Sequence, residues 1–353
     1  MRRLSHCGCR ILPPELLQRI ARNGNALQRE AALDTLAVDH TLRLGRATWQ
    51  LLDAGTRRGL FGISGAAKQR SIYDAHGDEA LPGRLVRAEG APAQADVEVN
   101  EAYDGLGATF DFFADVYDRN SIDDAGLHLA ASVHYGRRYD NAFWNGQQMV
   151  FGDGDGELFN RFTISLDVIA HELTHGVTGD EARLVYLGQA GALNESVSDV
   201  FGSLVKQYAR RERAADADWL IGAGLFTAKV HGVALRSMKA PGTAYDDPLL
   251  GRDPQPATMD GYVRTQADDG GVHTNSGIPN HAFYLAAIAL GGYAWEKAGR
   301  IWYETLRDKR IKPTATFRQF ARLTVQNAAH FFGSAERQAV AAAWAEVGIK
   351  ATG

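Results

Sequence analysis

The stretch His171-Glu-Leu-Thr-His175, followed by Asn-Glu-Ser-Val-Ser-Asp at residues 194–199, decides how this chain folds. On an α-helix, which has about 3.6 residues per turn, His171 and His175 lie on one face and direct two imidazole nitrogens at the same point. Glu172 lies beside that face, and Glu195 follows twenty positions after His175. This spacing predicts a helix that binds a metal ion.

Two histidines four residues apart also occur as partly buried surface pairs, so the flanking residues must decide between the two interpretations. Residues 164–170 are mostly apolar, which predicts that the histidine helix is buried. Residues 192–211 have apolar side chains at helical spacing and predict a second, antiparallel helix with Glu195 and Asp199 on one face. Two acidic residues buried against two histidines are costly without a cation between them.

Zinc is the ion that this set of side chains favours. Two neutral imidazoles and the Glu195 carboxylate leave a fourth position for water, as in catalytic zinc sites. Asp199 is interpreted as the carboxylate that accepts the second ring N–H of a ligating histidine, and Asn194 is a weaker candidate for that role. Glu172 is then suited to take a proton from the attacking water and to pass it to a leaving amine.

At these residues the chain resembles the thermolysin-like zinc metallopeptidases, peptidase family M4. The resemblance covers roughly residues 71–350, with further matching motifs at residues 133–146, 149–156, 235–238 and 268–277. It implies an α+β, two-lobed gluzincin fold. The β-rich N-terminal lobe, residues 71–179, would end in the zinc-binding helix, and residues 180–353 would form a mainly helical C-terminal lobe.

The resemblance also implies roles for residues outside the two helices. His273 and Tyr186 match the side chains that stabilise the oxyanion formed when water adds to a peptide carbonyl, and Asp268 would orient His273. Without the surrounding motif, a lone histidine in a Gly-rich loop would be interpreted as an ordinary surface residue.

Three further residues match positions that bind the substrate backbone. Asn141 and Ala142 match the edge strand to which a substrate adds as an extra strand. Arg236 matches the residue that contacts the carbonyl group on the leaving-group side.

Six apolar residues match the family's pocket for the residue after the scissile bond. An enzyme with such a pocket should cleave before Leu, Ile or Phe, although one methylene group discriminates by only about 1–3 kcal/mol. The alternative is that these side chains are ordinary core. The six are Phe159, Phe162, Val168, Ile221, Leu225 and Leu235.

A calcium cluster that many members carry is incomplete in this chain, which makes calcium binding doubtful. Asp167 and Asp218 remain, but the other matching positions hold Lys206, Leu220 and Ala223. Calcium needs about six to eight oxygen ligands. Our hypothesis is that the Lys206 ammonium replaces the ion and pairs with Asp167 or Asp218; the alternative is that Lys206 points into water.

Residues 1–65 are expected to form a propeptide and linker, with the boundary between residues 51 and 70. The Pro13-Pro14 pair, the polar helical segment 25–52 and the Gly/Arg-rich stretch 55–67 resemble the short propeptide of the protealysin branch. The resemblance implies a latent proenzyme whose N-terminal arm covers the active site until it is removed at an exposed linker. An ordinary N-terminal helical subdomain is the alternative.

The first residues bear on export and on the two cysteines. Basic residues near Met1 are not followed by an apolar stretch, which argues against a secretory signal and predicts a cytoplasmic protein or export by a non-classical route, with action outside the cell left open. Cys7 and Cys9 are too close in sequence for an ordinary disulfide. That one of them is a fourth zinc ligand in the latent form is a further hypothesis.

Composition limits the partners. A net charge of −4 gives no reason to expect nucleic acid or membrane binding, and we expect a monomer that acts on protein or peptide substrates. Its own propeptide is an expected partner, and the sequence does not decide whether a dedicated protein inhibitor exists. Strand-like segments lie at residues 71–74, 84–87 and 128–134, and helical ones at residues 278–290, 299–308 and 335–347.

Two other functional classes compete with the endopeptidase. A binding protein that had kept a protease fold would be expected to lose Glu172 or a zinc ligand, and all are present. An aminopeptidase or another zinc hydrolase is the closer competitor, because the zinc residues alone do not separate internal from terminal cleavage. The oxyanion and edge-strand motifs favour the endopeptidase.

Overall fold

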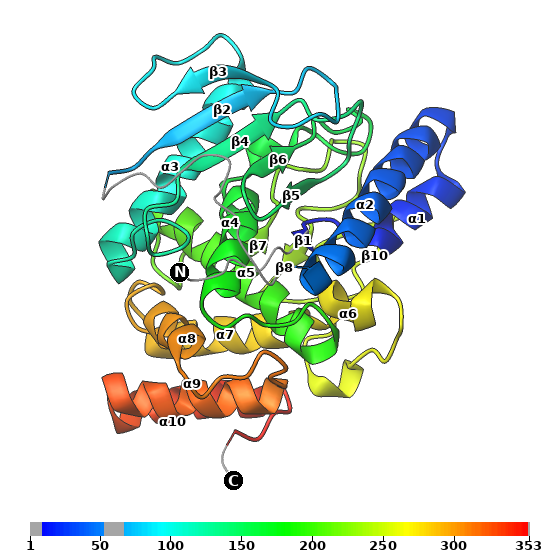
Figure 1. Ribbon diagram of the computed structural model, residues 1–353. Helices are drawn as coiled ribbons and strands as arrows, with labels where there is room; N and C mark the ends of the chain where they lie inside the picture. Colours follow the sequence, from blue (N-terminus) through cyan, green and yellow to red (C-terminus); the bar gives the residue numbers. More distant parts are fainter. Residues whose placement is uncertain (1–8, 53–66, 352–353) are drawn as a thin grey trace.

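A computed structural model describes residues 9–52 and 67–351 (Figure 1). Its main sheet consists of β1 (Cys9–Arg10), β2 (Arg70–Asp74), β3 (Arg84–Ala88), β4 (Leu129–Val133), β5 (Ala142–Trp144) and β6 (Met149–Phe151). The strand order is β1-β5-β6-β4-β2-β3. β2, β4 and β6 are parallel, whereas β1, β3 and β5 run antiparallel to their neighbours. The three predicted strands are confirmed to within one residue at each end.

A long helix, α3 (Val97–Tyr117), contacts the sheet in a region where the sequence pattern predicts only strands. Its first turn is capped by Asp96, whose carboxylate accepts a hydrogen bond from the Glu98 N–H at 2.9 Å. The helical signal was present in the sequence, because the buried residues recur at intervals of three and four. They include Val99, Ala102, Tyr103, Leu106, Phe110 and Phe113.

Two buried helices, α4 (Leu166–Asp180) and α5 (Gly188–Arg210), cross the centre of the molecule (Figure 1). They are antiparallel, as predicted, since residues late in α5 meet residues early in α4. Gly202 lets the backbones approach closely: a Cβ atom there would lie 2.5 Å from the Asp167 carbonyl oxygen. This close packing brings the side chains of the two helices face to face.

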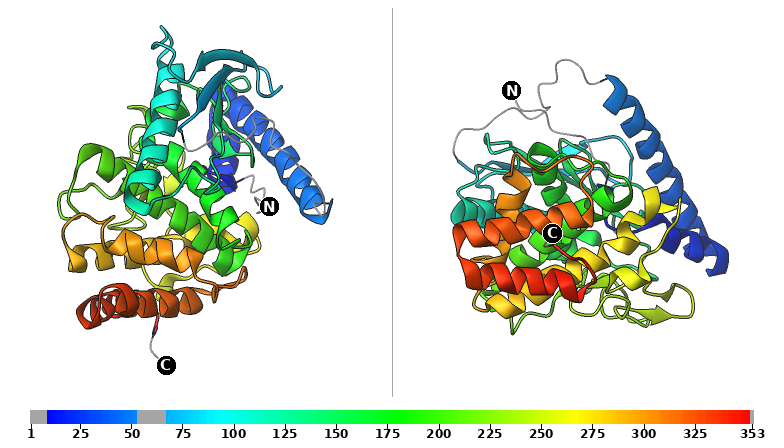
Figure 2. Two further views of the ribbon diagram at one scale, coloured as in Figure 1. Left: turned by 60° about the vertical axis from the view of Figure 1, so that its left-hand side comes forward. Right: turned by 90° about the horizontal axis from the view of Figure 1, so that it is seen from below.

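The C-terminal helices form a layer below α5 in Figure 1, and the right-hand view of Figure 2 shows this layer from below. They are α6 (Asp268–Asn275), α7 (Gly277–Leu290), α8 (Ala298–Arg307), α9 (Phe317–Phe331) and α10 (Ser334–Glu346), with 3-10 turns η1 (Phe162–Ile164) and η2 (Met259–Gly261). Short strand pairs precede them: β7 (Leu220–Ile221) with β8 (Arg236–Ser237), and β9 (Asp246–Asp247) with β10 (Gly251–Arg252).

The α+β class is confirmed, with a β-containing N-terminal region and a helical C-terminal region. The three predicted C-terminal helices are confirmed, and each of their ends lies within one residue of the predicted position. Among the described residues, no helix has both the length and the apolar character needed to cross a bilayer.

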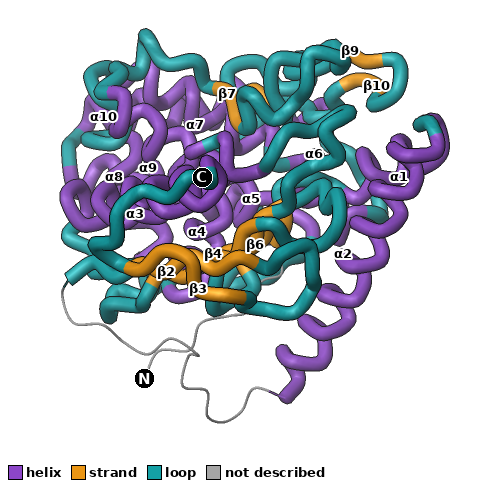
Figure 3. Tube along the Cα trace, turned by 90° about the horizontal axis from the view of Figure 1, so that it is seen from above, coloured by secondary structure: helices purple, strands orange, loops and turns teal. Residues whose placement is uncertain are grey.

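The N-terminal arm, residues 9–52, consists of β1, α1 (Pro14–Asn23) and α2 (Ala26–Leu52). Figure 3 shows α1 and α2 along one side of the molecule, and β1 adds to the sheet beside β5. The inward face of α1 is apolar and buried, including Leu16, Leu17 and Ile20. Cys7, the side chain of Cys9 and most of the predicted linker lie outside the described residues, so the hypothesis of a cysteine ligand stays a prediction.

Candidate metal centre

The two histidines of α4 and a glutamate of α5 converge in the interior. The Nε2 atoms of His171 and His175 are 3.1 Å apart. Glu195 places Oε2 3.5 Å from the first of these nitrogens and Oε1 3.4 Å from the second. All three side chains are buried to 1% exposure or less.

The other ring nitrogens of both histidines are held by side chains of α5. His171 Nδ1 lies 2.8 Å from Asp199 Oδ1, and His175 Nδ1 lies 2.8 Å from Asn194 Oδ1. These contacts orient the rings so that both Nε2 atoms face Glu195. Asp199 and Asn194 thus each contact a ring nitrogen of one α4 histidine.

This donor set fits a bound cation. Burial lowers the pKa of His175 to about 3 and so keeps it neutral, the form that ligates a metal. Burial also opposes a charge on His171, but Asp199 and Glu195 raise its pKa to about 9. A metal ion bound here would supply to these two carboxylates the positive charge that the proton on His171 otherwise supplies. Among the described residues, Glu195 Oε2 is buried without a hydrogen-bond partner.

Glu172 lies next to the two histidines, and one of its carboxylate oxygens is within 4.8 Å of a ring nitrogen of each. Its Oε2 accepts a hydrogen bond from the Trp144 N–H at 3.1 Å, and within the described part of the chain its Oε1 has no hydrogen-bond partner. Burial raises the pKa of Glu172 to about 8. A carboxylate with one anchored and one unengaged oxygen can exchange a proton with water at this centre.

Tyr186 and His273 approach from outside the helix pair. The Tyr186 hydroxyl donates to Glu195 Oε1 and lies 3.2 Å from His273 Nε2. Asp268 holds His273 twice: Oδ1 is 2.6 Å from Nδ1, and Oδ2 accepts from the His273 N–H at 2.9 Å. Burial opposes a charge on His273, but Asp268 and Glu195 raise its pKa to about 10. The imidazolium therefore has a proton on Nε2 to donate.

Arg236 contacts the metal centre through Asp199, a contact that its position in the sequence does not indicate. Its Nε and Nη2 donate to the two oxygens of Asp199 at 2.9 and 2.8 Å. Asn280 donates to Asp199 Oδ2 at 2.8 Å. Burial opposes the charge on Asp199, yet Arg236 and His171 lower its pKa to about 2. Neither Asn280 nor the Arg236–Asp199 pair was predicted, and no local motif in the sequence indicates them.

The six predicted pocket residues are all buried, with 4% exposure at most. Phe159 and Phe162 have ring centroids 6.0 Å apart. Gly222, in a left-handed conformation, lies between Leu225 and Leu235: a Cβ there would come within 3.0 Å of both side chains. Ile221 is the β7 partner of Arg236, whereas Val168 belongs to α4.

The arm adds a strand to the edge that was predicted to bind substrate. β1 is antiparallel to β5. The Ile11 N–H donates to the Ala142 carbonyl oxygen at 3.4 Å, and the Leu12 N–H donates to Asn141 Oδ1 at 3.1 Å. Both predicted edge-strand residues therefore hold the backbone of an extended peptide, which is a segment of this chain.

Two consecutive carbonyl groups of the arm, those of Arg10 and Ile11, accept hydrogen bonds from cationic side chains. His273 Nε2 donates to the Arg10 carbonyl oxygen at 2.8 Å, and Arg236 Nη1 donates to the Ile11 carbonyl oxygen at 3.0 Å. A hollow of about 130 Å³ remains between the arm and the lobe beside these contacts. Its lining includes Pro13, Leu16, Leu235, Arg236, Tyr245 and His273.

The side chain of Arg10 turns toward α2. Its Nε lies 3.0 Å from Asp39 Oδ1, and both residues are almost fully buried. The Asp39 carboxylate also accepts from the Tyr139 hydroxyl at 2.7 Å and from Asn141 Nδ2 at 3.2 Å. Asp39 thus ties α2, the arm strand and the edge of the sheet together, a role that the sequence did not indicate.

Lys206 is buried between Asp167 and Asp218, the two acidic residues of the predicted but incomplete calcium cluster. Its Nζ lies 2.8 Å from Asp167 Oδ2 and 2.8 Å from Asp218 Oδ1, and it donates to the Leu220 carbonyl oxygen at 2.7 Å. With 4% exposure, Lys206 does not point into water, so that alternative is wrong.

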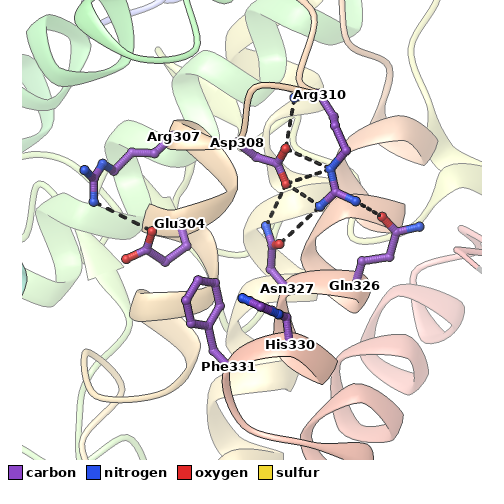
Figure 4. A pocket seen from close by; sticks show the side chains of 8 residues that line it. All are labelled: Glu304, Arg307, Asp308, Arg310, Gln326, Asn327, His330 and Phe331. Atoms are coloured by element: carbon purple, nitrogen blue, oxygen red, sulfur yellow. Dashed lines mark hydrogen bonds and ion pairs between the residues drawn. The ribbon is translucent and has the colours of Figure 1, made fainter.

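A separate polar hollow of about 480 Å³ lies between α8 and α9 (Figure 4). Arg310 contacts Asp308 there, and Asn327 completes a network of polar contacts. None of the predicted site residues lines it, so the chemistry is assigned to the α4–α5 centre.

Comparisons with known proteins agree with this geometry. The family model described as Thermolysin metallopeptidase, catalytic domain, matches residues 43–179, and the model of the alpha-helical domain matches residues 182–349. An extracellular metalloprotease of Pectobacterium carotovorum subsp. carotovorum is 55% identical over 97% of this chain and 96% of its own. An extracellular minor metalloprotease of Serratia marcescens is 41% identical over 87% of this chain and 84% of its own.

A solved structure, the precursor of protealysin, a metalloproteinase from Serratia proteamaculans, is similar with a TM-score of 0.88. It is 55% identical and covers 97% of this chain and 99% of its own. The two-lobed thermolysin-like arrangement that the motifs implied is therefore confirmed.

The localisation expected from the first residues is wrong. Two of these relatives are named extracellular proteases, which points to secretion. Basic residues near Met1 without a following apolar stretch therefore do not distinguish a cytoplasmic protein from a secreted one.

Proposed function

Because this chain belongs to the thermolysin family of zinc metalloendopeptidases, we propose that it cleaves polypeptides internally, before large hydrophobic residues, and is made as a latent proenzyme. The observation that supports this most directly is the extended arm backbone beside the metal centre, bound through Asn141, Ala142, Arg236 and His273. A site that binds one peptide backbone in this manner is suited to bind others.

His171, His175 and Glu195 would hold the zinc ion, which when bound makes water a stronger acid and polarises a carbonyl group. Glu172 takes the proton of the attacking water and delivers it to the leaving nitrogen. Its anchored oxygen, held by the Trp144 N–H, fixes the orientation of the carboxylate during both transfers.

Tyr186 and His273 donate hydrogen bonds to the oxygen that becomes negative as water adds, with Asp268 keeping His273 oriented. Arg236 binds the carbonyl group on the leaving side. Its two contacts with Asp199 hold the guanidinium rigid, which lowers the entropic cost of binding that carbonyl.

Specificity is proposed to arise from the apolar set around Gly222 and the two phenylalanines. We expect an unstructured polypeptide incubated with the processed enzyme to yield internal fragments whose new N-termini are Leu, Ile or Phe. Mass spectrometry of the fragments measures this. Stepwise loss of single terminal residues would instead indicate an exopeptidase, the main alternative class.

We also propose the domain division that the sequence predicts. Residues 1–65 are the propeptide and linker, residues 71–179 the lobe that ends in the zinc-binding helix, and residues 180–353 the helical lobe. The name of the protealysin precursor, a relative that is similar over nearly the whole chain, supports a propeptide. The arm also occupies the edge strand to which a substrate would have to add.

The Arg10–Asp39 ion pair should determine how tightly the arm is held. In an Asp39→Asn variant, the buried Arg10 faces an amide, and breaking a buried pair costs about 3–5 kcal/mol. We expect the unprocessed variant to cleave a fluorogenic peptide at least tenfold faster than the unprocessed wild type. Initial rates are measured while gel analysis shows an intact chain.

Asp34→Asn is the matched control, because Asp34 lies on α2 but is exposed. Its rate should equal that of the wild type. Equal rates in all three proteins would mean that the arm does not limit access to the site.

Lys206 is proposed to replace calcium. Its ammonium group supplies positive charge to Asp167 and Asp218 at 2.8 Å each. An ion in the same place would need about six oxygen ligands, and Lys206, Leu220 and Ala223 supply no side-chain oxygen.

A further inference from the structure

The arm lies beside the metal centre in the direction and register of a substrate. Its strand is antiparallel to β5, and two successive N–H groups, those of Ile11 and Leu12, donate to Ala142 and Asn141. Cys9 and Arg10 pair with Trp144 and Phe143, and the hydrogen bonds of Ile11 and Leu12 extend this pairing without a gap. A segment that merely covered the site would not need this strand-like register.

The contacts also identify which peptide bond lies at the centre. The Arg10 carbonyl oxygen accepts from His273 Nε2, and that nitrogen is 3.2 Å from the Tyr186 hydroxyl and 3.6 Å from Glu195 Oε2. The following carbonyl, that of Ile11, accepts from Arg236. The Arg10 carbonyl therefore occupies the position assigned to the reacting carbonyl, and Arg236 binds on the leaving side of it.

Ile11, the residue on the leaving side, is of the type that the proposed specificity requires. Ile11 is large, apolar and fully buried. Arg10, on the other side of the bond, has its guanidinium group drawn away toward Asp39. A large apolar residue therefore stands directly after the Arg10 carbonyl group, as the proposed specificity requires.

The geometry points to the Arg10–Ile11 peptide bond as a self-cleavage site, hydrolysed within the same molecule; this rests on the proposed endopeptidase function. Water adds to the Arg10 carbonyl carbon, the bond from that carbon to the Ile11 nitrogen breaks, and Glu172 transfers the proton from water to the departing amine. One water is consumed, and the products are a peptide that ends in the Arg10 carboxylate and a chain that begins at Ile11.

The cut has a consequence for the arm. Release of the first ten residues removes both the β1–β5 pairing and the Arg10–Asp39 ion pair. The remaining arm, from Ile11 onward, is then held less tightly than before.

Intact-mass spectrometry of the zinc-loaded, full-length chain over time tests this inference. We expect a species that lacks residues 1–10 and begins at Ile11, formed at a rate constant that does not change over a tenfold dilution. The Glu172→Gln variant should not form it. If the chain is cut only within the linker and no species begins at Ile11, the inference is overturned. If the species that begins at Ile11 forms more slowly on dilution, the cut is made by another molecule and self-cleavage is overturned.

Two variants at one position provide a matched comparison. Ile11→Leu should be cut at nearly the wild-type rate, whereas Ile11→Asp should be cut at least about 100-fold more slowly, because it places a carboxylate in an apolar environment. Equal cutting of both variants would contradict the assignment of Ile11. A processed enzyme that cleaves other polypeptides before hydrophobic residues but leaves Arg10–Ile11 intact would refute only this inference, whereas an enzyme that cleaves nothing would refute the proposed function.

Discussion

A Glu172→Gln variant is expected to keep its zinc ion and to lose about 10³-fold in kcat/KM on a peptide substrate, within the usual range for removing a general base. Glutamine has the same shape, and its amide oxygen can still accept the Trp144 N–H that now lies 3.1 Å from Glu172 Oε2. It cannot accept a proton from water. The loss should therefore appear in turnover and leave the fold unchanged.

Three measurements separate chemistry from damage to the structure. Metal analysis should give one zinc per chain in wild type and variant, and thermal unfolding midpoints should agree. Glu346→Gln, an exposed position on α10, is the control for an amide substitution and should have full activity. If Glu172→Gln retains more than a tenth of the wild-type rate, the assignment of Glu172 as the base is wrong.

A Lys206→Met variant is expected to lose about 3–5 kcal/mol of unfolding free energy, the usual cost of removing one partner from a buried ion pair. Methionine fills a similar volume but leaves the fully buried Asp167 carboxylate without its ammonium partner at 2.8 Å. Lys206 is 4% exposed, so water can compensate only in part. Denaturant unfolding, carried out in the Glu172→Gln background to prevent self-digestion, measures the loss.

Lys229→Met is the matched control, since the Lys229–Glu157 pair has a similar length, 2.6 Å, but both side chains are partly exposed. It should cost less than about 1 kcal/mol. A calcium-selective chelator should leave the wild-type unfolding curve unchanged. Prompt unfolding of the wild type on calcium removal would contradict the replacement of calcium by Lys206.

The pH dependence of the Lys206 site follows from the acidic partner. Burial opposes the charge on Asp218, but Lys206 lowers its pKa below the usual 3.8. A lowered pKa contributes stability that is present above pH 3.8 and lost as the pH falls through the lower, folded-state value. The difference in stability between wild type and Lys206→Met should accordingly shrink in strong acid.

Several parts of the centre follow from local sequence because the helix repeat alone determines them. His171 and His175 share a face wherever a helix forms, and Glu195 and Asp199 do so on the second helix. The antiparallel pairing was also predictable, since the twenty positions from His175 to Glu195 leave room for one turn and a second helix that returns along the first. α3 was missed, although its buried residues recur at helical spacing, because the interpretation of that region relied on strand-like segments alone.

The contacts across long sequence separations were not predictable from one sequence. Asn280 reaches Asp199 across 81 positions, and Asp39 reaches Asn141 across 102. Each pair involves a polar residue whose neighbours in sequence carry no motif. Whether such a residue faces water or a buried partner depends on how separate elements pack.

The sequence alone identified the family through matched motifs, and it predicted the zinc ligands and the helix pair that presents them. Those features depend on spacings of a few residues, which local backbone geometry turns into fixed distances. Only the tertiary structure decided that Lys206 is buried between two carboxylates, that Arg236 is clamped to Asp199, and that the Arg10–Ile11 bond lies at the centre. These contacts join elements far apart in the chain, and their energies depend on burial, which exists only once the elements have packed together.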